Sequence, residues 1–288
     1  MSLARTRRTA PVCALVLSFC VIAGLSRAAS REAAPAAAPV APPAAAPMET
    51  KKPAEPVKAP IKPVKAPKTL PTITYRHVPG GFPADPGQTD PTPLTEGLHA
   101  PRELPLYDAP GGRPRAFLPP DIRGVEVTVP IVARRPGWVA VLLPSANRRI
   151  GWLPASGWHS RPLRDQLIVR RGTHELTWLR DGVREGSWTV AIGSTRTPTP
   201  LGRTFVLGRT GTHGAVYAGK DALVLGAVPD DRDAVAPGLR DAHTGIHAWY
   251  RRSAFGRSVS NGCVRLPAAA QQTLLDHIGP GTPVIVLD

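Results

Sequence analysis

The sequence is poor in cysteine and in recognisable ligand patterns for metals or phosphates. Only three cysteines, Cys13, Cys20 and Cys263, occur among 288 residues, which excludes a small fold held together by several disulfides. No CxxC or HExxH pattern is present, so the usual spacings of zinc ligands are missing. The glycine-rich stretch GGFPADPG has neither the lysine nor the strand–helix setting of a phosphate-binding loop. We therefore expect no metal and no cofactor.

Long hydrophobic runs are also scarce, which excludes a polytopic membrane protein. The apolar run from Ala10 to Leu25 follows an arginine-rich start and precedes small residues that end at Ala28 and Ala29. This order is typical of a secretory signal peptide. We predict a signal peptide over residues 1–28, and therefore an exported protein of the periplasm, the cell wall or the extracellular space. An uncleaved membrane anchor is the alternative.

Acidic residues are few: the sequence has 21 of them and 36 lysines and arginines, which gives a formal charge of +15. Removal of the signal peptide would lower this charge to +11, because four arginines and no acidic residue lie in it. Residues 29–71 are almost entirely Ala, Pro, Lys and Val, and hold six of the seven lysines. Such a segment cannot bury a core, so we predict a disordered, extended linker.

The lysine-rich linker has two interpretations. It could hold anionic wall polymers by charge, or it could be an inert solvated spacer. It lacks the interleaved aromatic residues of a nucleic-acid-binding segment, so we expect no nucleic acid as a partner.

The middle of the sequence predicts a small β-domain. Residues 72–100 are rich in loop-forming residues, whereas residues 101–160 contain short apolar runs separated by Gly, Pro or Asn. The pairs Gly137-Trp138 and Gly151-Trp152 recur fourteen residues apart. This spacing resembles that of bacterial SH3-type domains. The resemblance implies a small barrel that binds wall peptide or packs on its neighbour, although tryptophans in small barrels are often simply core residues.

Residues 164–288 predict a second unit that is mostly β with one or two helices. Residues 166–193 predict a hairpin, because Leu167, Val169, Leu176 and Trp178 are spaced as strand positions and Asp181-Gly182 marks a turn. Pro267 and Gly279-Pro280 are suited to the start and end of a helix over residues 268–278. Further strands are expected at residues 204–207, 215–217, 223–227, 245–250 and 283–287.

Cys263 is the only cysteine outside the predicted signal peptide, and His247 precedes it by sixteen residues. Gly256 and Gly262 would let the chain return, so that the imidazole could deprotonate the thiol and create a nucleophile. The N–H groups of Gly262 and Cys263 are candidate donors to an oxyanion. A buried structural cysteine is the simpler alternative, and a zinc site that includes His243 is the least supported one. We expect His243 and His213 to be structural or exposed.

The stretch His247, Ser260-Asn261-Gly262-Cys263 and Arg265, together with TPTPLG at residues 197–202, resembles the catalytic motifs of L,D-transpeptidases of the YkuD type. The resemblance covers residues 164–288. It implies that Cys263 is the nucleophile, that His247 is the base and later the acid, and that the Ala248 carbonyl orients the imidazole. Ser260 and Asn261 would shape the pocket, and Arg265 would fix the site or a substrate carboxylate. Ala248 replaces a frequent glycine, and Asn261 replaces a frequent histidine.

The resemblance also implies a fold and an activity. We expect a mainly β protein, in which a small SH3-like barrel precedes a YkuD-like β-sandwich or mixed-sheet domain with one or two helices. The implied activity is transfer of a peptidoglycan tetrapeptide stem through a cysteine acyl-enzyme to an amine of a neighbouring stem, which forms a 3→3 crosslink. An L,D-carboxypeptidase, a transferase that links proteins to the wall, and a catalytically lapsed wall-binding scaffold are alternatives. Stem peptides are the expected partners, and the expected protein is monomeric.

Overall fold

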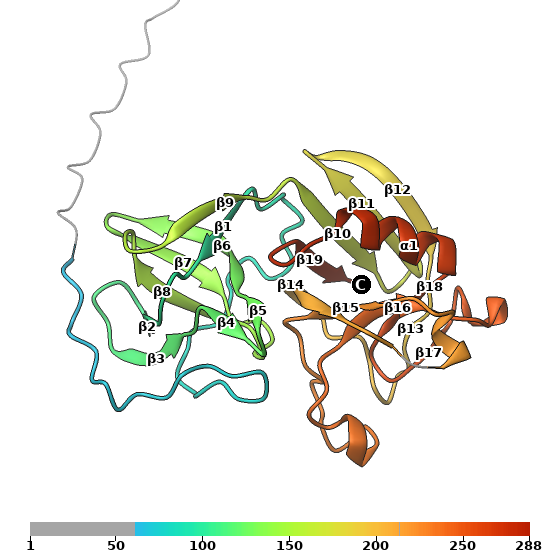
Figure 1. The fold of residues 1–288 in the computed structure, drawn as a ribbon, viewed down its shortest axis with the longest axis horizontal. Helices are drawn as coiled ribbons and strands as arrows, with labels where there is room; N and C mark the ends of the chain where they lie inside the picture. The colour runs from blue at the N-terminus through green and yellow to red at the C-terminus, as the bar shows by residue number, and fades with distance from the viewer. Residues whose placement is uncertain (1–60, 213) are drawn as a thin grey trace, which may run out of the picture. The chain divides into compact units, whose positions relative to one another are not determined.

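The computed structural model describes residues 61–212 and 214–288, which belong to one compact unit (Figure 1). The predicted signal peptide and most of the predicted linker lie outside the described residues. As predicted, the described part is mainly β, with a single α-helix. None of the helices in these residues is both long enough and apolar enough to cross a membrane.

The first sheet has seven strands in the order β3-β2-β8-β7-β6-β1-β9, and its neighbours pair antiparallel. Both Gly-Trp pairs lie at its centre, where Ala140 of one strand faces Trp152 of the next. Its resemblance to an SH3-type barrel stays a prediction. The strands are β1 (Glu96–His99), β2 (Leu104–Tyr107), β3 (Pro114–Leu118), β6 (Thr128–Arg135), β7 (Trp138–Leu142), β8 (Ile150–Pro154) and β9 (His159–Pro162); the separate hairpin consists of β4 (Asp121–Ile122) and β5 (Val125–Glu126).

The second sheet has eight strands in the order β12-β11-β10-β19-β14-β15-β16-β18. Its apolar face is covered by α1 (Ala268–His277), which follows Pro267 as predicted and packs its leucines into the core (Figure 1). The strands are β10 (Asp165–Arg170), β11 (Glu175–Arg180), β12 (Val183–Thr189), β14 (Gly202–Thr210), β15 (Ala222–Leu225), β16 (Gly245–Ala248), β18 (Val264–Leu266) and β19 (Pro283–Leu287). A separate parallel pair consists of β13 (Ile192–Gly193) and β17 (Ser258–Ser260).

Two local predictions differ from the structure. The predicted hairpin is a three-stranded meander, in which Asp181 and Gly182 have φ of 50° and 79° and form the turn between β11 and β12. The strand predicted at residues 215–217 is wrong, because Ala215–Tyr217 forms the 3-10 helix η1. Gly214, with φ of 101°, interrupts the extended chain just before it. Two more 3-10 turns, η2 (Pro237–Leu239) and η3 (Arg252–Ala254), lie on either side of β16.

Strand β14 contributes to both cores because its side chains alternate between two faces. Phe205 and Leu207 belong to the hydrophobic core of the first sheet, whereas Val206 belongs to that of the second. At the start of the same strand, Arg203 forms a buried ion pair with Asp85, with Nε to Oδ2 at 2.8 Å. The two sheets are therefore joined by shared packing on β14, and the buried charge pair ties β14 to the segment that precedes β1.

The last part of the predicted linker, residues 61–71, lies among the described residues and contacts the first sheet. The carbonyl oxygen of Ile61 accepts a hydrogen bond of 2.8 Å from Trp138 Nε1. The carbonyl oxygen of Val64 accepts one of 2.7 Å from the Tyr107 hydroxyl. Exposed backbone carbonyls of an extended, proline-rich chain suit such donors.

Candidate active site

Strand pairing brings His247, Arg265 and Cys263 to one side of the second sheet. Strands β16 and β18 are parallel neighbours, with His247 opposite Arg265. Cys263 immediately precedes β18, two residues before Arg265. Because residues two apart in an extended chain share a face, the thiol and the guanidinium emerge on the side that His247 occupies. The parallel pairing of β16 with β18, not a local turn, thus brings His247 close to the segment that contains Cys263.

The imidazole of His247 is buried, with 7% of the residue exposed. Its Nδ1 donates a hydrogen bond of 2.8 Å to the carbonyl oxygen of Ala248. Since a carbonyl only accepts, Nδ1 carries the proton and Nε2 keeps a free lone pair. Burial lowers the pKa of His247 to about 4, the Ala248 hydrogen bond acts in the opposite direction, and the charge of Arg265 lowers it further. At neutral pH the ring is therefore a neutral base.

Cys263 is half-buried and is the free thiol of the described residues. Burial raises the pKa of this thiol, whereas the Gly245 N–H and the charge of Arg265 act in the opposite direction. No hydrogen bond joins the side chains of Cys263 and His247 within the described part of the chain. Desolvation disfavours the charged form of both groups, so the resting site favours a neutral thiol and a neutral imidazole over the thiolate–imidazolium pair that proton transfer between them would give.

The turn before Cys263 is fixed by Ser260, which is 2% exposed. Its hydroxyl donates to the Cys263 carbonyl oxygen at 2.6 Å and accepts from the Gly262 N–H at 3.1 Å. Gly262 has φ of 106°, a conformation that favours glycine, and Asn261 is exposed at the tip. The oxyanion role predicted for the Gly262 N–H would require that group to leave the Ser260 hydroxyl.

The TPTP stretch at residues 197–200 supports this turn from behind. Thr197 Oγ1 donates to the Ser260 carbonyl oxygen at 3.1 Å. Thr199 Oγ1 accepts from the Gly193 N–H at 2.9 Å. The TPTP stretch passes close to Gly193, since a Cβ on this residue would lie 2.3 Å from the carbonyl oxygen of Thr197. Both motifs were recognised in the sequence, but the sequence did not indicate that the TPTP stretch holds the turn before Cys263 in place.

Two aromatic residues beside the imidazole were not among the predicted site residues. The ring of Tyr217, in η1, meets the His247 ring edge to face at a centroid distance of 5.0 Å. Trp249 lies 5.9 Å from the same ring, and the Arg265 guanidinium stacks on Trp249 at 3.7 Å. Both rings lie next to the buried imidazole, whose burial disfavours its charged form.

A buried glutamine also supports the histidine strand. Gln271 on α1 is fully buried, and its Nε2 donates to the carbonyl oxygens of Ile246, at 3.2 Å, and of Asp221, at 2.9 Å. It shares the buried helix face with Leu274 and Leu275. A polar residue at i, i+3 and i+4 spacing from buried leucines is the sequence pattern that could have identified it.

His243, a metal ligand in the zinc-site alternative, has both ring nitrogens directed at backbone carbonyl oxygens. Nδ1 faces the Leu225 carbonyl oxygen at 2.5 Å, and Nε2 faces the Tyr75 carbonyl oxygen at 2.7 Å. It is 8% exposed and stacks on the Tyr75 ring at 4.1 Å. Within the described residues, no three His, Cys, Asp or Glu side chains are grouped as metal ligands.

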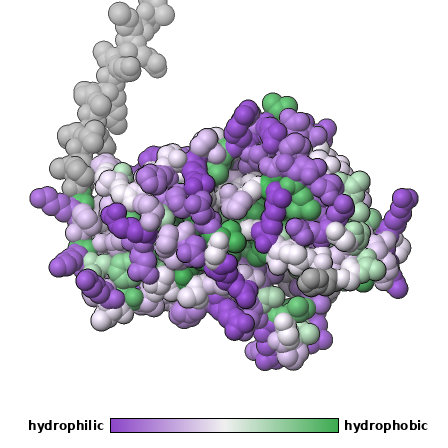
Figure 2. Space-filling view, viewed as in Figure 1, coloured by the Kyte–Doolittle hydropathy of each residue, from purple (hydrophilic) through white to green (hydrophobic). Residues whose placement is uncertain are grey.

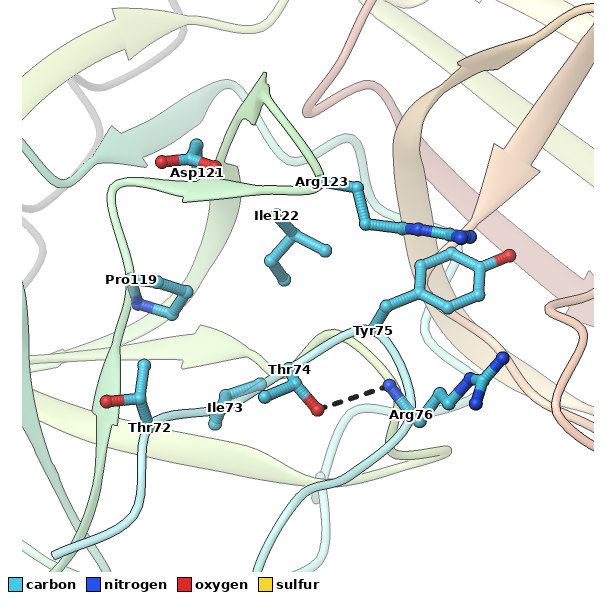
Figure 3. Close-up of a pocket in the computed structure, with 9 residues that line it drawn as sticks. All are labelled: Thr72, Ile73, Thr74, Tyr75, Arg76, Pro119, Asp121, Ile122 and Arg123. Atoms are coloured by element: carbon cyan, nitrogen blue, oxygen red, sulfur yellow. Dashed lines mark hydrogen bonds between the residues drawn. The ribbon is translucent and has the colours of Figure 1, made fainter.

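A cavity away from these residues has a different character (Figure 3). Its volume is about 430 Å³, and it is lined by residues 72–76 and by the β4–β5 hairpin. Tyr75 and Arg123 face each other at its edge, with the guanidinium 4.7 Å from the ring. It contains neither Cys263 nor His247. The face seen in Figure 2 is predominantly hydrophilic, with hydrophobic areas between hydrophilic residues.

The site combines a cysteine, a histidine that is hydrogen-bonded to a backbone carbonyl, and a turn fixed by hydrogen bonds. These features define a candidate cysteine acyltransferase site. Residues 164–286 match the family model described as the L,D-transpeptidase catalytic domain, YkuD. The "Putative L,D-transpeptidase YqjB" of Bacillus subtilis (strain 168) is 31% identical over 128 residues, which cover 42% of this chain and 70% of that protein. The chain belongs to the YkuD family of L,D-transpeptidases.

Solved structures of low sequence identity were also found. L,D-transpeptidase 3 from Mycobacterium tuberculosis, in complex with a faropenem-derived adduct, is 16% identical over 52% of this chain and 90% of that chain, with a TM-score of 0.36. An L,D-transpeptidase from Mycobacterium smegmatis is 15% identical over 52% and 90%, with a TM-score of 0.35. The C442S mutant of Enterococcus faecium L,D-transpeptidase is 20% identical over 43% and 50%, with a TM-score of 0.32.

Proposed function

We propose that the protein is an exported peptidoglycan L,D-transpeptidase that forms 3→3 crosslinks through an acyl-enzyme on Cys263. One observation carries the proposal: the Ala248 carbonyl fixes the tautomer of His247 and leaves its Nε2 free. His247 belongs to β16, and the neighbouring strand β18 begins directly after Cys263. Membership of the YkuD family supports the reaction class, and the expected substrates are tetrapeptide stems.

The proposed first half-reaction begins from the neutral pair. As Cys263 Sγ attacks the stem carbonyl carbon, His247 Nε2 takes the thiol proton, so no free thiolate has to be stabilised beforehand. The tetrahedral oxyanion would be held by the Cys263 N–H, and by the Gly262 N–H once it leaves Ser260. When the intermediate collapses, the imidazolium gives its proton to the departing amine of the terminal D-alanine. Its low pKa favours that transfer.

The proposed second half-reaction reverses these roles. An amine on a neighbouring stem attacks the thioester carbonyl carbon, His247 takes the proton of that amine, and the C–S bond breaks as the proton returns to sulfur. Water in place of the amine would give carboxypeptidase activity. The apolar surroundings of His247 and Cys263 limit the water that can compete.

The rest of the chain is proposed to place this site in the wall. The proposed organisation is a signal peptide over residues 1–28, a linker over 29–71, a connection over 72–100, an SH3-like domain over 101–160 and the catalytic domain over 164–288. The positively charged linker would hold the enzyme near anionic polymers.

Mass spectrometry of the purified protein with a carbapenem tests the proposal. We expect one covalent adduct in the wild type, none in Cys263→Ala, and much slower formation in His247→Gln. Incubation with stem tetrapeptide should then yield crosslinked dimers. An adduct that persists in Cys263→Ala, or a titratable thiol that forms none, would exclude acyl transfer at this site. Monomeric tripeptide without dimers would favour the carboxypeptidase.

A further inference from the structure

A second recess lies directly beside the catalytic residues. It has a volume of about 230 Å³ and is formed by the chain that follows β16, together with β17 and β18. Its lining residues are Trp249, Tyr250, Arg251, Ser253, Ala254, Arg257, Val259 and Arg265. We name it the arginine pocket. Apart from Arg265, none of these residues belongs to the predicted site.

The arginine pocket has positive charge without a balancing acid. Arg251, Arg257 and Arg265 line it, and no aspartate or glutamate does. Within the described part of the chain, none of the three forms a salt bridge. Some arginines elsewhere in these residues pair with carboxylates, as Arg203 does with Asp85, and others, such as Arg123, do not; the pocket differs because three unpaired arginines line one recess. Three clustered guanidinium groups without a counter-charge favour an anionic ligand.

An unsatisfied donor supports this interpretation independently. Arg265 Nε is buried and has no hydrogen-bond partner in the described structure. A buried donor without an acceptor costs free energy, and native proteins leave few of them. Its backbone is fixed on both sides, since Arg265 pairs with His247 and exchanges hydrogen bonds with Ala191. The side chain therefore remains in place for an acceptor supplied by a ligand.

The walls of the pocket are aromatic and apolar as well as basic. The guanidinium of Arg265 stacks on Trp249 at 3.7 Å, and that of Arg251 lies 5.3 Å from the Tyr250 ring. Such stacking orients a guanidinium while it leaves the N–H edge free for a planar anion. Tyr250 and Val259 are 49% and 40% exposed, respectively. Exposed apolar side chains beside unpaired cations suit a ligand that has both a carboxylate and apolar groups.

We propose that the arginine pocket binds a carboxylate of the peptide substrate and so aligns the stem with Cys263. The inference rests on the proposed function, and it names a substrate feature that the enzyme would require. A peptide is favoured over an inorganic anion because the aromatic wall continues to the imidazole through Trp249. Either the acyl donor or the acceptor stem could supply the carboxylate, which is the same chemical group in both.

Binding to the inert variant Cys263→Ser of the full chain tests the pocket apart from catalysis. We expect calorimetry to show that a stem peptide with its free carboxylate converted to an amide binds at least tenfold more weakly than the same peptide with the free carboxylate. Arg257→Gln in the same background should weaken the carboxylate peptide similarly and leave the amide peptide unchanged. Arg252→Gln is the matched control, because Arg252 belongs to the same loop but does not line the pocket. Equal affinities for acid and amide would overturn the proposal, as would an equal loss in Arg252→Gln.

Transfer reactions then identify which stem supplies the carboxylate. Amidation of the donor alone or of the acceptor alone should raise the KM of only one partner at least tenfold. Arg257→Gln made in the chain that keeps Cys263 should react with neutral iodoacetamide at the wild-type rate, which would show an intact thiol. The two proposals fail differently: a wild type without a carbapenem adduct defeats the proposed function, whereas normal adducts without acid–amide discrimination defeat only the pocket.

Discussion

The buried state of His247 predicts a specific loss of stability in acid. Its pKa is about 4 in the folded protein, against an ordinary value of 6.5. Between these values the unfolded chain binds a proton that the folded chain does not, so the free energy of unfolding falls as the pH decreases. The full difference of about 2.5 pKa units corresponds to about 3 kcal/mol. Between pH 7 and pH 5 the expected loss is about 2 kcal/mol.

Urea unfolding of wild type and His247→Gln at pH 7 and at pH 5 measures this loss. His243 also has a pKa lowered by burial, but it is present in both proteins, so its contribution cancels in the difference. We expect the wild type to lose about 2 kcal/mol more than the variant between the two pH values. The same loss in both proteins would mean that His247 titrates normally, and would refute the argument that burial keeps it a neutral base.

Three further changes have defined outcomes. Asp85→Asn should destabilise the protein by about 3–5 kcal/mol in urea, because Arg203 would stay buried without its carboxylate; a loss below about 1 kcal/mol would contradict a buried pair. Gly262→Ala should cost roughly 1–3 kcal/mol through backbone strain at φ of 106° and slow carbapenem acylation, and an unchanged acylation rate would show that the turn tolerates a side chain. Tyr107→Phe should speed tryptic cleavage after Lys65, because it removes a hydrogen bond of 2.7 Å to the carbonyl oxygen of the neighbouring Val64; unchanged cleavage would show that this bond does not hold the segment.

Features encoded by neighbouring residues could be predicted from the sequence. The helix expected over residues 268–278 was predicted from Pro267 at its start and Gly279-Pro280 at its end, and the structure confirms it over Ala268–His277. Cys263 and His247 were identified because their motifs are local, and the closing strand at residues 283–287 because it is a short apolar run. In each case the evidence lies within a few residues.

Features that depend on distant contacts could not be predicted. Nothing near Asp85 indicates Arg203, since 118 positions separate the partners of that buried pair. The neutral resting state of Cys263 depends on burial by several elements, which a motif does not reveal. The 3-10 turn at Ala215–Tyr217 was mistaken for a strand because three apolar residues suit either structure, and the glycine before them decides the outcome.

The dual role of β14 makes the first sheet part of the support of the site. Phe205 and Leu207 need the first sheet to be buried, and β14 pairs with β15, which in turn pairs with the histidine strand β16. The Ser145 N–H also donates to the Gly226 carbonyl oxygen, just after β15, at 2.8 Å. Any shift of the first sheet would therefore reach His247 through two strand pairings. A module that only binds the wall could be attached to the second sheet by a flexible linker alone. The shared packing of β14 therefore indicates that the first sheet also supports the site.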